Sequence, residues 1–349
     1  MADNSHIEWT DATWNPVTGC SIVSPGCTNC YAMKLAGTRL RNHPSRKGLT
    51  TASKSGPVWN GTVRFNEEWL LQPLSWKKPR MIFVCAHGDL FHEDVPDEWI
   101  DQVFAVMALT TQHTFQVLTK RSKRMRDYVN SLHNSRALAS IVAELLRESE
   151  LGPRAMTLAR TIPNVWLGVS VERQKEADER IPDLLATPAA VRFISAEPLL
   201  GPLDLNNVPS FADLHQGLDY RIDALSGMYK SGIVRLCATA PKLDWVIVGG
   251  ESGDGARAMH PDWARALRNE CEAAGVAFFF KQWGNWAPST PEQATGNPRS
   301  GWKALSGNVL PKAAELYPNA GAAFVEHMLK ATAGRLLDGV EHNGMPVRP

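Results

Sequence analysis

Trp245-Val246-Ile247-Val248-Gly249-Gly250-Glu251 is an apolar run of strand length that stops at two glycines and a carboxylate. The same pattern, a short apolar run followed by polar residues, recurs at 81–85, 115–119, 165–170, 191–195 and 276–280. Amphipathic helical patterns separate these runs, at about 97–112, 122–132, 136–149, 172–186 and 261–274. Apolar strands that alternate with amphipathic helices are typical of a parallel sheet covered by helices.

A further strand at His6–Thr10 brings the expected number of strands to seven. The sequence therefore predicts an α/β fold, a parallel β/α (partial TIM-type) barrel of six to seven strands with helices outside and a C-terminal cap. A doubly wound open sheet is the alternative. We expect residues 1–287 to form a single barrel-like catalytic domain, with irregular insertions at about 42–62 and 201–243. Residues 288–349, with one helix near 320–333, are expected to form a cap or lid.

The composition is that of an ordinary globular protein, with 44% hydrophobic and 21% charged residues in a chain of 349. No apolar run reaches the roughly 18 residues that a membrane span needs, and the N-terminus has no basic and apolar leader. Six cysteines, three of them clustered, do not resemble a secreted disulfide scaffold. We expect a cytoplasmic protein in a reducing compartment, with no membrane partner.

Cys20, Cys27 and Cys30 have the spacing C-x6-C-x2-C. Three thiolates can hold three irons of a [4Fe–4S] cluster and leave the fourth iron open to another ligand. Ser24, Pro25 and Gly26 favour a tight turn between the first two cysteines, as a loop around a cluster requires. The alternative is a zinc site, which usually takes four ligands; His6 could be the fourth, but the sequence has no second C-x-x-C pair.

Polar residues follow every expected strand, where parallel β/α folds gather their chemistry. Among them, the candidate catalytic residues are Lys120, Arg121, Glu197, Glu251 and Lys281. A hydrolytic metal site made of His87, Asp89 and His92 is an alternative reading of the same edge. The turn from Gly249 to Gly253 could approach a ligand closely, but it lacks the spacing of a P-loop.

Two basic clusters could attract phosphate groups. The segment from Ala32 to Asn66 has no acidic residue and contains Lys34, Arg39, Arg41, Arg46, Lys47, Lys54 and Arg64. The second cluster is Lys120, Arg121, Lys123, Arg124 and Arg126. For each cluster, an ordinary solvated face is the alternative. Trp9, Trp14, Trp283 and Trp286 lie near expected strand ends, where they could stack on a base or pack in the core.

The cysteine triad after the first strand of a parallel barrel resembles the radical S-adenosylmethionine superfamily. That superfamily usually has C-x3-C-x2-C, whereas the first gap here is six residues. The resemblance implies a [4Fe–4S] cluster on Cys20, Cys27 and Cys30, with S-adenosylmethionine chelating the open iron. One electron then cleaves the sulfonium and yields a 5′-deoxyadenosyl radical.

A closer resemblance is to a phage- and prophage-associated family of uncharacterised proteins with a three-cysteine motif. The motifs that carry it span most of the chain: 8–10, 13–16, 19–31, 88–91, 118–121, 195–199, 249–253 and 280–284. Carried over by position, the resemblance implies that Gly88 and Asp89 hold the amino group of the methionine moiety. It also implies that Ser170 and Glu172 bind the ribose hydroxyls, and that Gly249 and Gly250 approach the adenine or the methionine backbone.

The sequence thus predicts a radical S-adenosylmethionine-type iron–sulfur enzyme that acts on a nucleotide or nucleic acid, in DNA modification or repair. The expected partners are DNA, RNA or a nucleotide, and a phage or prophage protein. Two alternatives stay open: a non-catalytic iron–sulfur or zinc protein that binds nucleic acid, and a metal-dependent hydrolase.

Overall fold

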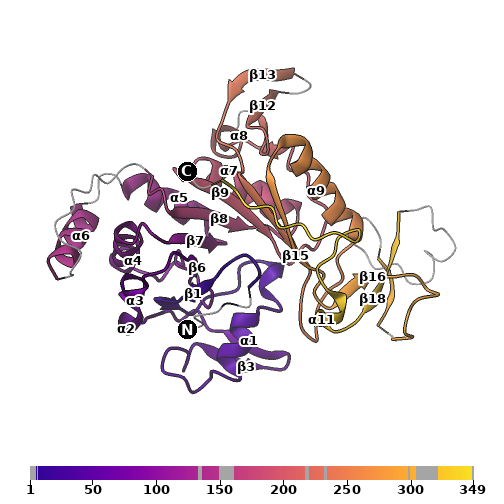
Figure 1. Ribbon diagram of the computed structural model, residues 1–349, viewed down its shortest axis with the longest axis horizontal. Helices are drawn as coiled ribbons and strands as arrows, with labels where there is room; N and C mark the ends of the chain where they lie inside the picture. Colours follow the sequence, from indigo (N-terminus) through magenta and orange to yellow (C-terminus); the bar gives the residue numbers. More distant parts are fainter. Residues whose placement is uncertain are drawn as a thin grey trace.

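Seven parallel strands form one curled sheet, a half-barrel flanked by helices (Figure 1). The computed structural model describes residues 5, 7–132, 136–148, 161–216, 220–231, 234–297, 299–303 and 321–347. The strands lie side by side in chain order: β1 (Ala12–Trp14), β6 (Met81–Val84), β7 (Thr114–Thr119), β8 (Val165–Ser170), β9 (Val191–Ala196), β14 (Trp245–Gly249) and β15 (Ala277–Gln282). Sequential order with parallel pairing is the arrangement of a partial β/α barrel, which confirms the predicted fold class.

The connecting helices lie where the amphipathic patterns predicted them, within a few residues. They are α4 (Asp97–Leu109), α5 (Ser122–Ser131), α6 (Arg136–Glu148), α7 (Gln174–Leu185) and α9 (Pro261–Ala274). The ends of α9 follow directly from sequence: Pro261 is its first residue, and Gly275 stops it in the left-handed conformation at φ 65°.

Alternate residues of each strand enter two different apolar clusters, because successive side chains of a strand point to opposite faces. Ile82, Val117 and Val246 belong to the large core with the helices. Their neighbours on the other face belong to a second, mostly aromatic cluster with Trp9: Trp166, Val191, Phe193, Trp245, Ile247 and Phe279. Trp9, Trp14 and Trp283 are buried, so core packing is the correct interpretation for these three tryptophans.

The first strand lies further along the chain than predicted. Residues 8–9 form a turn, in which the Thr10 amide donates to the Ile7 carbonyl at 3.1 Å. Strand β1 begins at Ala12, directly after Asp11 pairs with Met81. The prediction of a strand at 6–10 was wrong. Trp9 packs in the aromatic cluster from a turn, and the apolar pattern of the sequence does not distinguish this from a strand.

Both insertions expected to be irregular contain regular structure. After α1 (Tyr31–Gly37), segment 42–62 holds an antiparallel hairpin of β3 (Thr50–Ser53) and β4 (Gly56–Trp59). It is pinned by Trp59, which is buried against α1. Segment 201–243 holds a small antiparallel sheet and one helix: β10 (Val208–Pro209), α8 (Phe211–Gln216), β11 (Arg221–Asp223), β12 (Met228–Ser231) and β13 (Val234–Thr239).

The C-terminal part is a small sheet followed by a tail, rather than mainly a helix near 320–333. The sheet contains β16 (Trp286–Pro288), β17 (Gly301–Lys303) and β18 (Ala323–His327), and the predicted helix shrinks to α11 (Lys330–Ala333). The tail returns to the half-barrel beside β15, where the Phe280 amide donates to the His342 carbonyl at 2.9 Å. The remaining short elements are β2 (Val17–Thr18), η1 (Pro25–Cys27), β5 (Arg64–Phe65), α2 (Glu67–Leu70) and α3 (Gln72–Ser75). Within the described ranges, none of the helices has both the length and the apolar character needed to cross a membrane.

Candidate functional site

A cavity of 390 Å³ opens at the carboxyl ends of the parallel strands. Loops after the strands bring most of the predicted site residues to its wall: Cys20, Cys27, Cys30, Gly88, Asp89, Lys120, Arg121, Ser170, Glu197, Gly250, Glu251 and Lys281. Glu172 and Gly249 are not among the lining residues. In the chain, Gly249 directly precedes the lining residue Gly250, and Glu172 lies two residues after the lining residue Ser170. The volume is in the usual range for a small-molecule site, about 300–1,000 Å³.

Trp9 belongs both to the cavity wall and to the aromatic cluster inside the half-barrel. Its ring meets Trp245 edge to face, with centroids 6.0 Å apart. Its indole Nε1 is buried and has no hydrogen-bond partner in the described part of the chain. This nitrogen is enclosed by protein, although other atoms of the residue line the cavity.

The three predicted cluster ligands lie on one loop around the cavity. Cys27 ends the short helix η1, and Cys30 is the residue before α1. Burial raises the pKa of the Cys20 thiol to about 12 and also raises the pKa of Cys30. The Cys20 and Cys30 thiols are therefore protonated near neutral pH unless a soft cation displaces the protons.

No group of three or more His, Cys, Asp or Glu side chains among the described residues is placed to hold a metal ion. A [4Fe–4S] cluster, by contrast, takes each thiolate on a different iron, so its ligands surround a volume instead of meeting at a point. Three soft sulfur donors around a cavity fit that kind of group.

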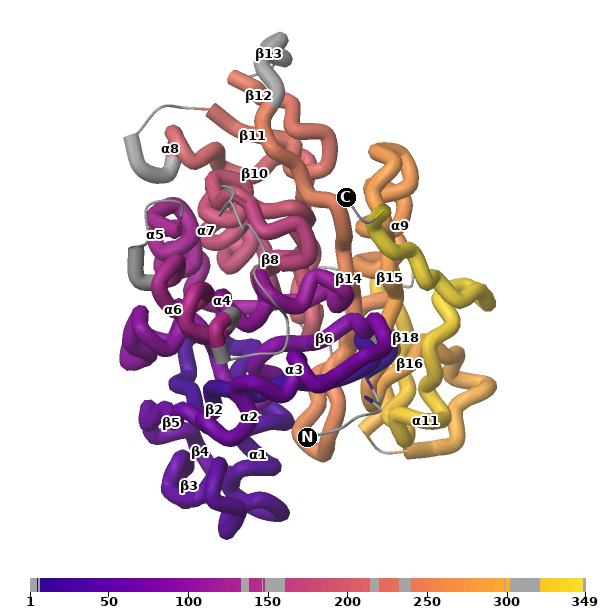
Figure 2. Tube along the Cα trace, turned by 60° about the vertical axis from the view of Figure 1, so that its left-hand side comes forward, coloured from indigo at the N-terminus to yellow at the C-terminus, as the bar shows by residue number. Residues whose placement is uncertain are grey.

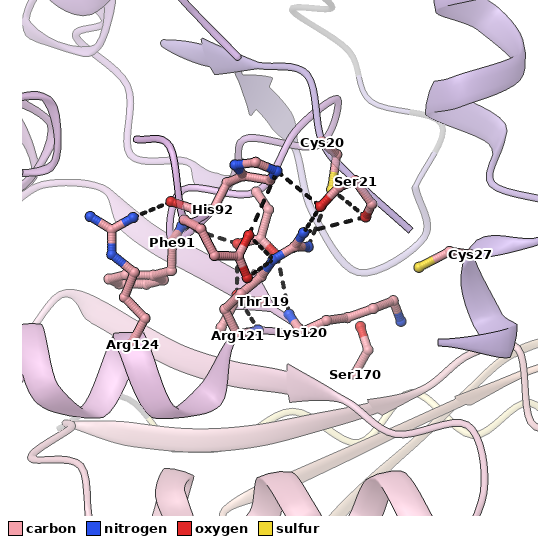
Figure 3. Close-up of polar contacts among 12 residues, drawn as sticks. Cys20, Ser21, Cys27, Phe91, His92, Thr119, Lys120, Arg121, Arg124 and Ser170 are labelled. Carbon is pink, nitrogen blue, oxygen red and sulfur yellow. Dashed lines mark hydrogen bonds and ion pairs between the residues drawn. The ribbon is translucent and has the colours of Figure 1, made fainter. Parts of the chain in front are cut away.

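The first anchor of the cysteine loop is the Asp89–Arg121 ion pair, which is almost fully buried. Figure 3 shows Arg121 reaching toward Ser21 of the loop. The Arg121 guanidinium donates from Nη1 to Asp89 Oδ2 at 3.1 Å and to the Cys20 Sγ at 3.3 Å. From Nη2 it reaches the Ser21 hydroxyl at 2.6 Å. Asp89 also accepts from the Thr119 hydroxyl and from the backbone amides of residues 91 and 120, so the four acceptor positions of its carboxylate are in use.

The second anchor is Glu172, whose side chain is fully buried beneath the loop. It accepts from the Ser24 hydroxyl at 3.0 Å, from Arg180 Nη1 at 3.1 Å and from the ammonium of Lys120. These cations and the hydroxyl lower its pKa against the opposing effect of burial. A Cβ on Gly26 would lie 2.2 Å from Glu172 Oε1, so only glycine allows the loop to rest on this carboxylate.

The third anchor is Glu251, which pairs with Arg257. The same carboxylate accepts from Asn29 Nδ2 at 3.0 Å, and Arg257 Nη2 donates to the Pro25 carbonyl at 2.9 Å. The three anchors follow β6–β7, β7–β8 and β14, so the loop is held from several strand ends at once. Most of the charge at this edge therefore positions the loop.

Glu197 and Lys281 form a different kind of pair. The Lys281 ammonium lies 2.8 and 2.9 Å from the two carboxylate oxygens of Glu197, and both residues line the cavity. Neither makes a hydrogen bond to the cysteine loop in the described part of the chain. Beside them, Ser170 and Ser195 lie opposite each other on β8 and β9 and also line the cavity. This part of the cavity wall offers a carboxylate, an ammonium group and two hydroxyls to a ligand.

Two of the predicted glycines are explained by close packing. A Cβ on Gly88 would lie 2.9 Å from the Val17 carbonyl oxygen, and Gly88 bridges to Gly19 at the start of the cysteine loop. A Cβ on Gly250 would lie 2.0 Å from the Trp283 carbonyl oxygen. The assignment of ligand contacts to Gly88, Asp89, Ser170, Glu172, Gly249 and Gly250 stays a prediction.

The side chains of the alternative metal site go to three different partners. His87 Nδ1 faces Arg46, and burial together with this guanidinium lowers its pKa to about 4. His92 Nε2 lies 3.0 Å from the Ser21 hydroxyl, while Asp89 holds Arg121. The structure does not bring these three side chains together around a common centre.

Several site residues have no signal in the sequence. Arg257 and Arg180 hold the loop but occur in none of the motifs. Asn29 lies within the motif at 19–31 but has no role assigned by it, and Ser24 is indicated only as a turn residue. Trp59 and Lys330 reach the cavity wall from segments predicted to be irregular or peripheral. Only the spacing of small polar residues around the cysteines could have suggested Ser24 and Asn29.

Comparisons with curated proteins and with solved structures find no match. A family model does match, over residues 4–346, and it is described as a protein of unknown function, DUF5131. The match covers the cysteine loop, all seven strands and the C-terminal sheet. The chain therefore belongs to the DUF5131 family.

Proposed function

We propose that the protein is a radical S-adenosylmethionine-type iron–sulfur enzyme. One observation carries the proposal: three cysteines on a loop at the carboxyl edge of a parallel half-barrel share a single cavity with the polar strand ends. Cys20, Cys27 and Cys30 would hold a [4Fe–4S] cluster. When bound, that cluster supplies one electron for the reductive cleavage of S-adenosylmethionine into methionine and a carbon-centred radical.

In this proposal, the residues of the chain hold the cysteine loop in position and bind S-adenosylmethionine. The three anchors fix the loop so that the thiols face the cavity, and Arg121 places a positive charge against Cys20. Ser170 and Ser195 offer hydroxyls to a ribose. Glu197 and Lys281 face the remaining cavity, where Glu197 could accept from an ammonium and Lys281 could pair with a carboxylate. The phage association and the cytoplasmic location stay predictions.

The test begins with protein purified without oxygen. We expect about four irons per chain, and an EPR signal of the reduced protein that changes when S-adenosylmethionine is added. Cys27→Ala should lose the iron, whereas Cys271→Ala, which removes a buried thiol on α9, should keep it. An EPR signal that is indifferent to S-adenosylmethionine, or protein that takes up no iron after reconstitution, would refute the proposal.

A further inference from the structure

The two basic clusters of the sequence have different surroundings in the structure. In the second cluster every cation has a carboxylate partner; the pairs are Lys120–Glu172, Arg121–Asp89, Lys123–Asp127, Arg124–Asp97 and Arg126–Asp183. Most of these ion pairs join different elements, and the charge of each cation is neutralised locally. The attraction of this cluster for phosphate stays a prediction, and its local pairing makes it the weaker candidate of the two.

The first cluster keeps its charge. It lies on what we call the hairpin lobe, residues 32–66, which contains most of α1, the β3–β4 hairpin and β5. Arg39, Arg41, Lys47 and Lys54 are exposed, and no ion pair or side-chain hydrogen bond to any of them occurs within the described residues. The lobe has no acidic residue of its own, so these four cations face solvent without a local counter-charge. Such a surface attracts polyanions.

The other three cations of the lobe build it. Arg46 is buried and donates to the Ser45 hydroxyl at 2.8 Å, and Arg64 Nη2 donates to the Lys47 carbonyl at 2.8 Å. Lys34 donates to Asn29 in the cysteine loop at 3.3 Å. The division is useful, because the four exposed cations can be removed without touching the contacts that hold the lobe together.

The hairpin lobe forms part of the cavity wall. Ala32 of α1 and Trp59 of β4 line the cavity together with Tyr31, a residue that is 50% exposed. Figure 1 and Figure 2 show α1 and the hairpin at the same end of the molecule, projecting from the half-barrel. The lobe that carries the four exposed cations thus also supplies two residues of the cavity wall, Ala32 and Trp59.

We propose that the hairpin lobe binds the phosphodiester backbone of a single-stranded nucleic acid and presents one nucleotide to the cavity. A base stacked in a duplex cannot enter a cavity of this size, whereas an unpaired nucleotide can. Tyr31 and Trp59 bring aromatic side chains to the cavity wall, and single-strand binding surfaces commonly use aromatic side chains to stack on bases. The inference rests on the proposed function only where it makes the bound strand the substrate; the binding itself does not require the cluster.

The experiment measures binding of fluorescein-labelled single-stranded DNA, single-stranded RNA and a DNA hairpin by anisotropy over a range of salt concentrations. The lobe variant carries Arg39→Ala, Arg41→Ala, Lys47→Ala and Lys54→Ala together. We expect it to bind a single strand at least tenfold more weakly. The slope of log affinity against log salt should become shallower by about 3, from about 0.7 for each lost phosphate contact.

A matched control removes four exposed lysines outside the lobe, by Lys77→Ala, Lys78→Ala, Lys123→Ala and Lys175→Ala. Its net charge changes by the same amount as that of the lobe variant. It should bind like the unmodified protein. Equal loss in both variants, no loss in the lobe variant, or tighter binding of the hairpin than of either single strand would each overturn the inference. The tighter of the two single strands identifies the polymer.

Iron content and the EPR response to S-adenosylmethionine are recorded for all three proteins. Lobe-dependent binding by a protein without that response would refute the proposed function and leave the lobe as a nucleic-acid surface. The response without lobe-dependent binding would refute the lobe and leave the proposed function.

Discussion

Arg121 makes more contacts with the cysteine loop than any other cation described above. Its guanidinium donates hydrogen bonds to Asp89, Glu93 and the Cys20 thiol, and to the carbonyl and hydroxyl oxygens of Ser21. Only 4% of its side chain is exposed, so its charge and that of Asp89 depend on each other. Removing one member of such a pair leaves a buried charge unpaired, which typically costs about 3–5 kcal/mol.

We therefore expect Arg121→Ala to lower the free energy of unfolding by about 3 kcal/mol and to reduce iron retention. Arg121→Lys should recover part of both, because lysine keeps the charge but loses the planar fork. Lys123→Ala is the control, since its side chain is 72% exposed and its ion pair should contribute less than about 1 kcal/mol. Urea unfolding and iron quantification check this; an Arg121→Ala protein as stable as the control would contradict it.

At the residue scale, the sequence located the site better than it assigned the roles. Glu197 and Lys281 could be placed because each follows an apolar run, and parallel strands bring such positions to one edge. Cys20 was indicated by its spacing from Cys27 and Cys30. Glu172 and Asp89 look like ligand-binding carboxylates in the sequence, yet they accept from Arg180, Lys120 and Arg121. A sequence does not show which cation will reach which carboxylate, because that depends on three-dimensional distances between distant segments.

Among the elements, α9 contains an acidic group in an unfavourable place. Glu270 is partly buried, its Oε2 has no hydrogen-bond partner within the described chain, and Asp204 and Asp223 repel its charged form. Burial is the largest cause, and together these effects raise its pKa to about 7 from an ordinary value of 4.5. The folded protein therefore holds this proton over a pH range in which the unfolded chain has lost it.

The direction in which pH changes the free energy of unfolding follows from the protons bound in each state. Below pH 4.5 the carboxyl is protonated in both states and costs nothing. Between pH 4.5 and 7 the unfolded state ionises first, so stability falls as the pH rises, and above pH 7 the loss is constant. At about 1.4 kcal/mol for each pKa unit, the full loss is up to about 3 kcal/mol.

We expect Glu270→Gln to be more stable than the unmodified protein by about 1–3 kcal/mol at pH 8 and to match it near pH 4.5. Glu272→Gln, at an exposed position on the same helix, removes the same charge and should show no such pH dependence. Chemical unfolding at several pH values measures both. A constant difference between the two variants across the range would contradict the assignment.

The elements predicted from sequence are those with a strong period. Strands such as Val165–Ser170 and helices such as α9 could be read from apolar runs and from Pro261 and Gly275. The β3–β4 hairpin could not, because its strands are short and mostly exposed, and only Trp59 contributes a buried side chain. In the C-terminal part, the pattern at 323–327 is too short to separate a strand from a helix.

For the molecule as a whole, the cysteine loop is held by the fold and not only by what it binds. Its anchors come from widely separated parts of the chain, at Asp89, Glu172 and Glu251. This arrangement differs from zinc fingers, in which metal binding and folding are one event. The loop should therefore keep its conformation when iron is removed.

We expect removal of iron by a chelator to lower the melting temperature by less than about 3 °C, which corresponds to about 2 kcal/mol in a chain of this size. Hydrogen exchange of residues 20–31 should change little. Calorimetry and hydrogen exchange of the same preparation, before and after chelation, provide the measurement. Loss of cooperative unfolding in the iron-free protein would show that the anchors are not sufficient.

The three anchors also have a consequence for the lifetime of the protein in cells. Oxygen destroys exposed iron–sulfur centres, and a chain that unfolds when this happens must be degraded and made again. If the proposed cluster is bound, a loop held by ion pairs would keep its thiols in position after the damage, so that iron and sulfide could be delivered to a folded acceptor. The same molecule could then be repaired and returned to use many times.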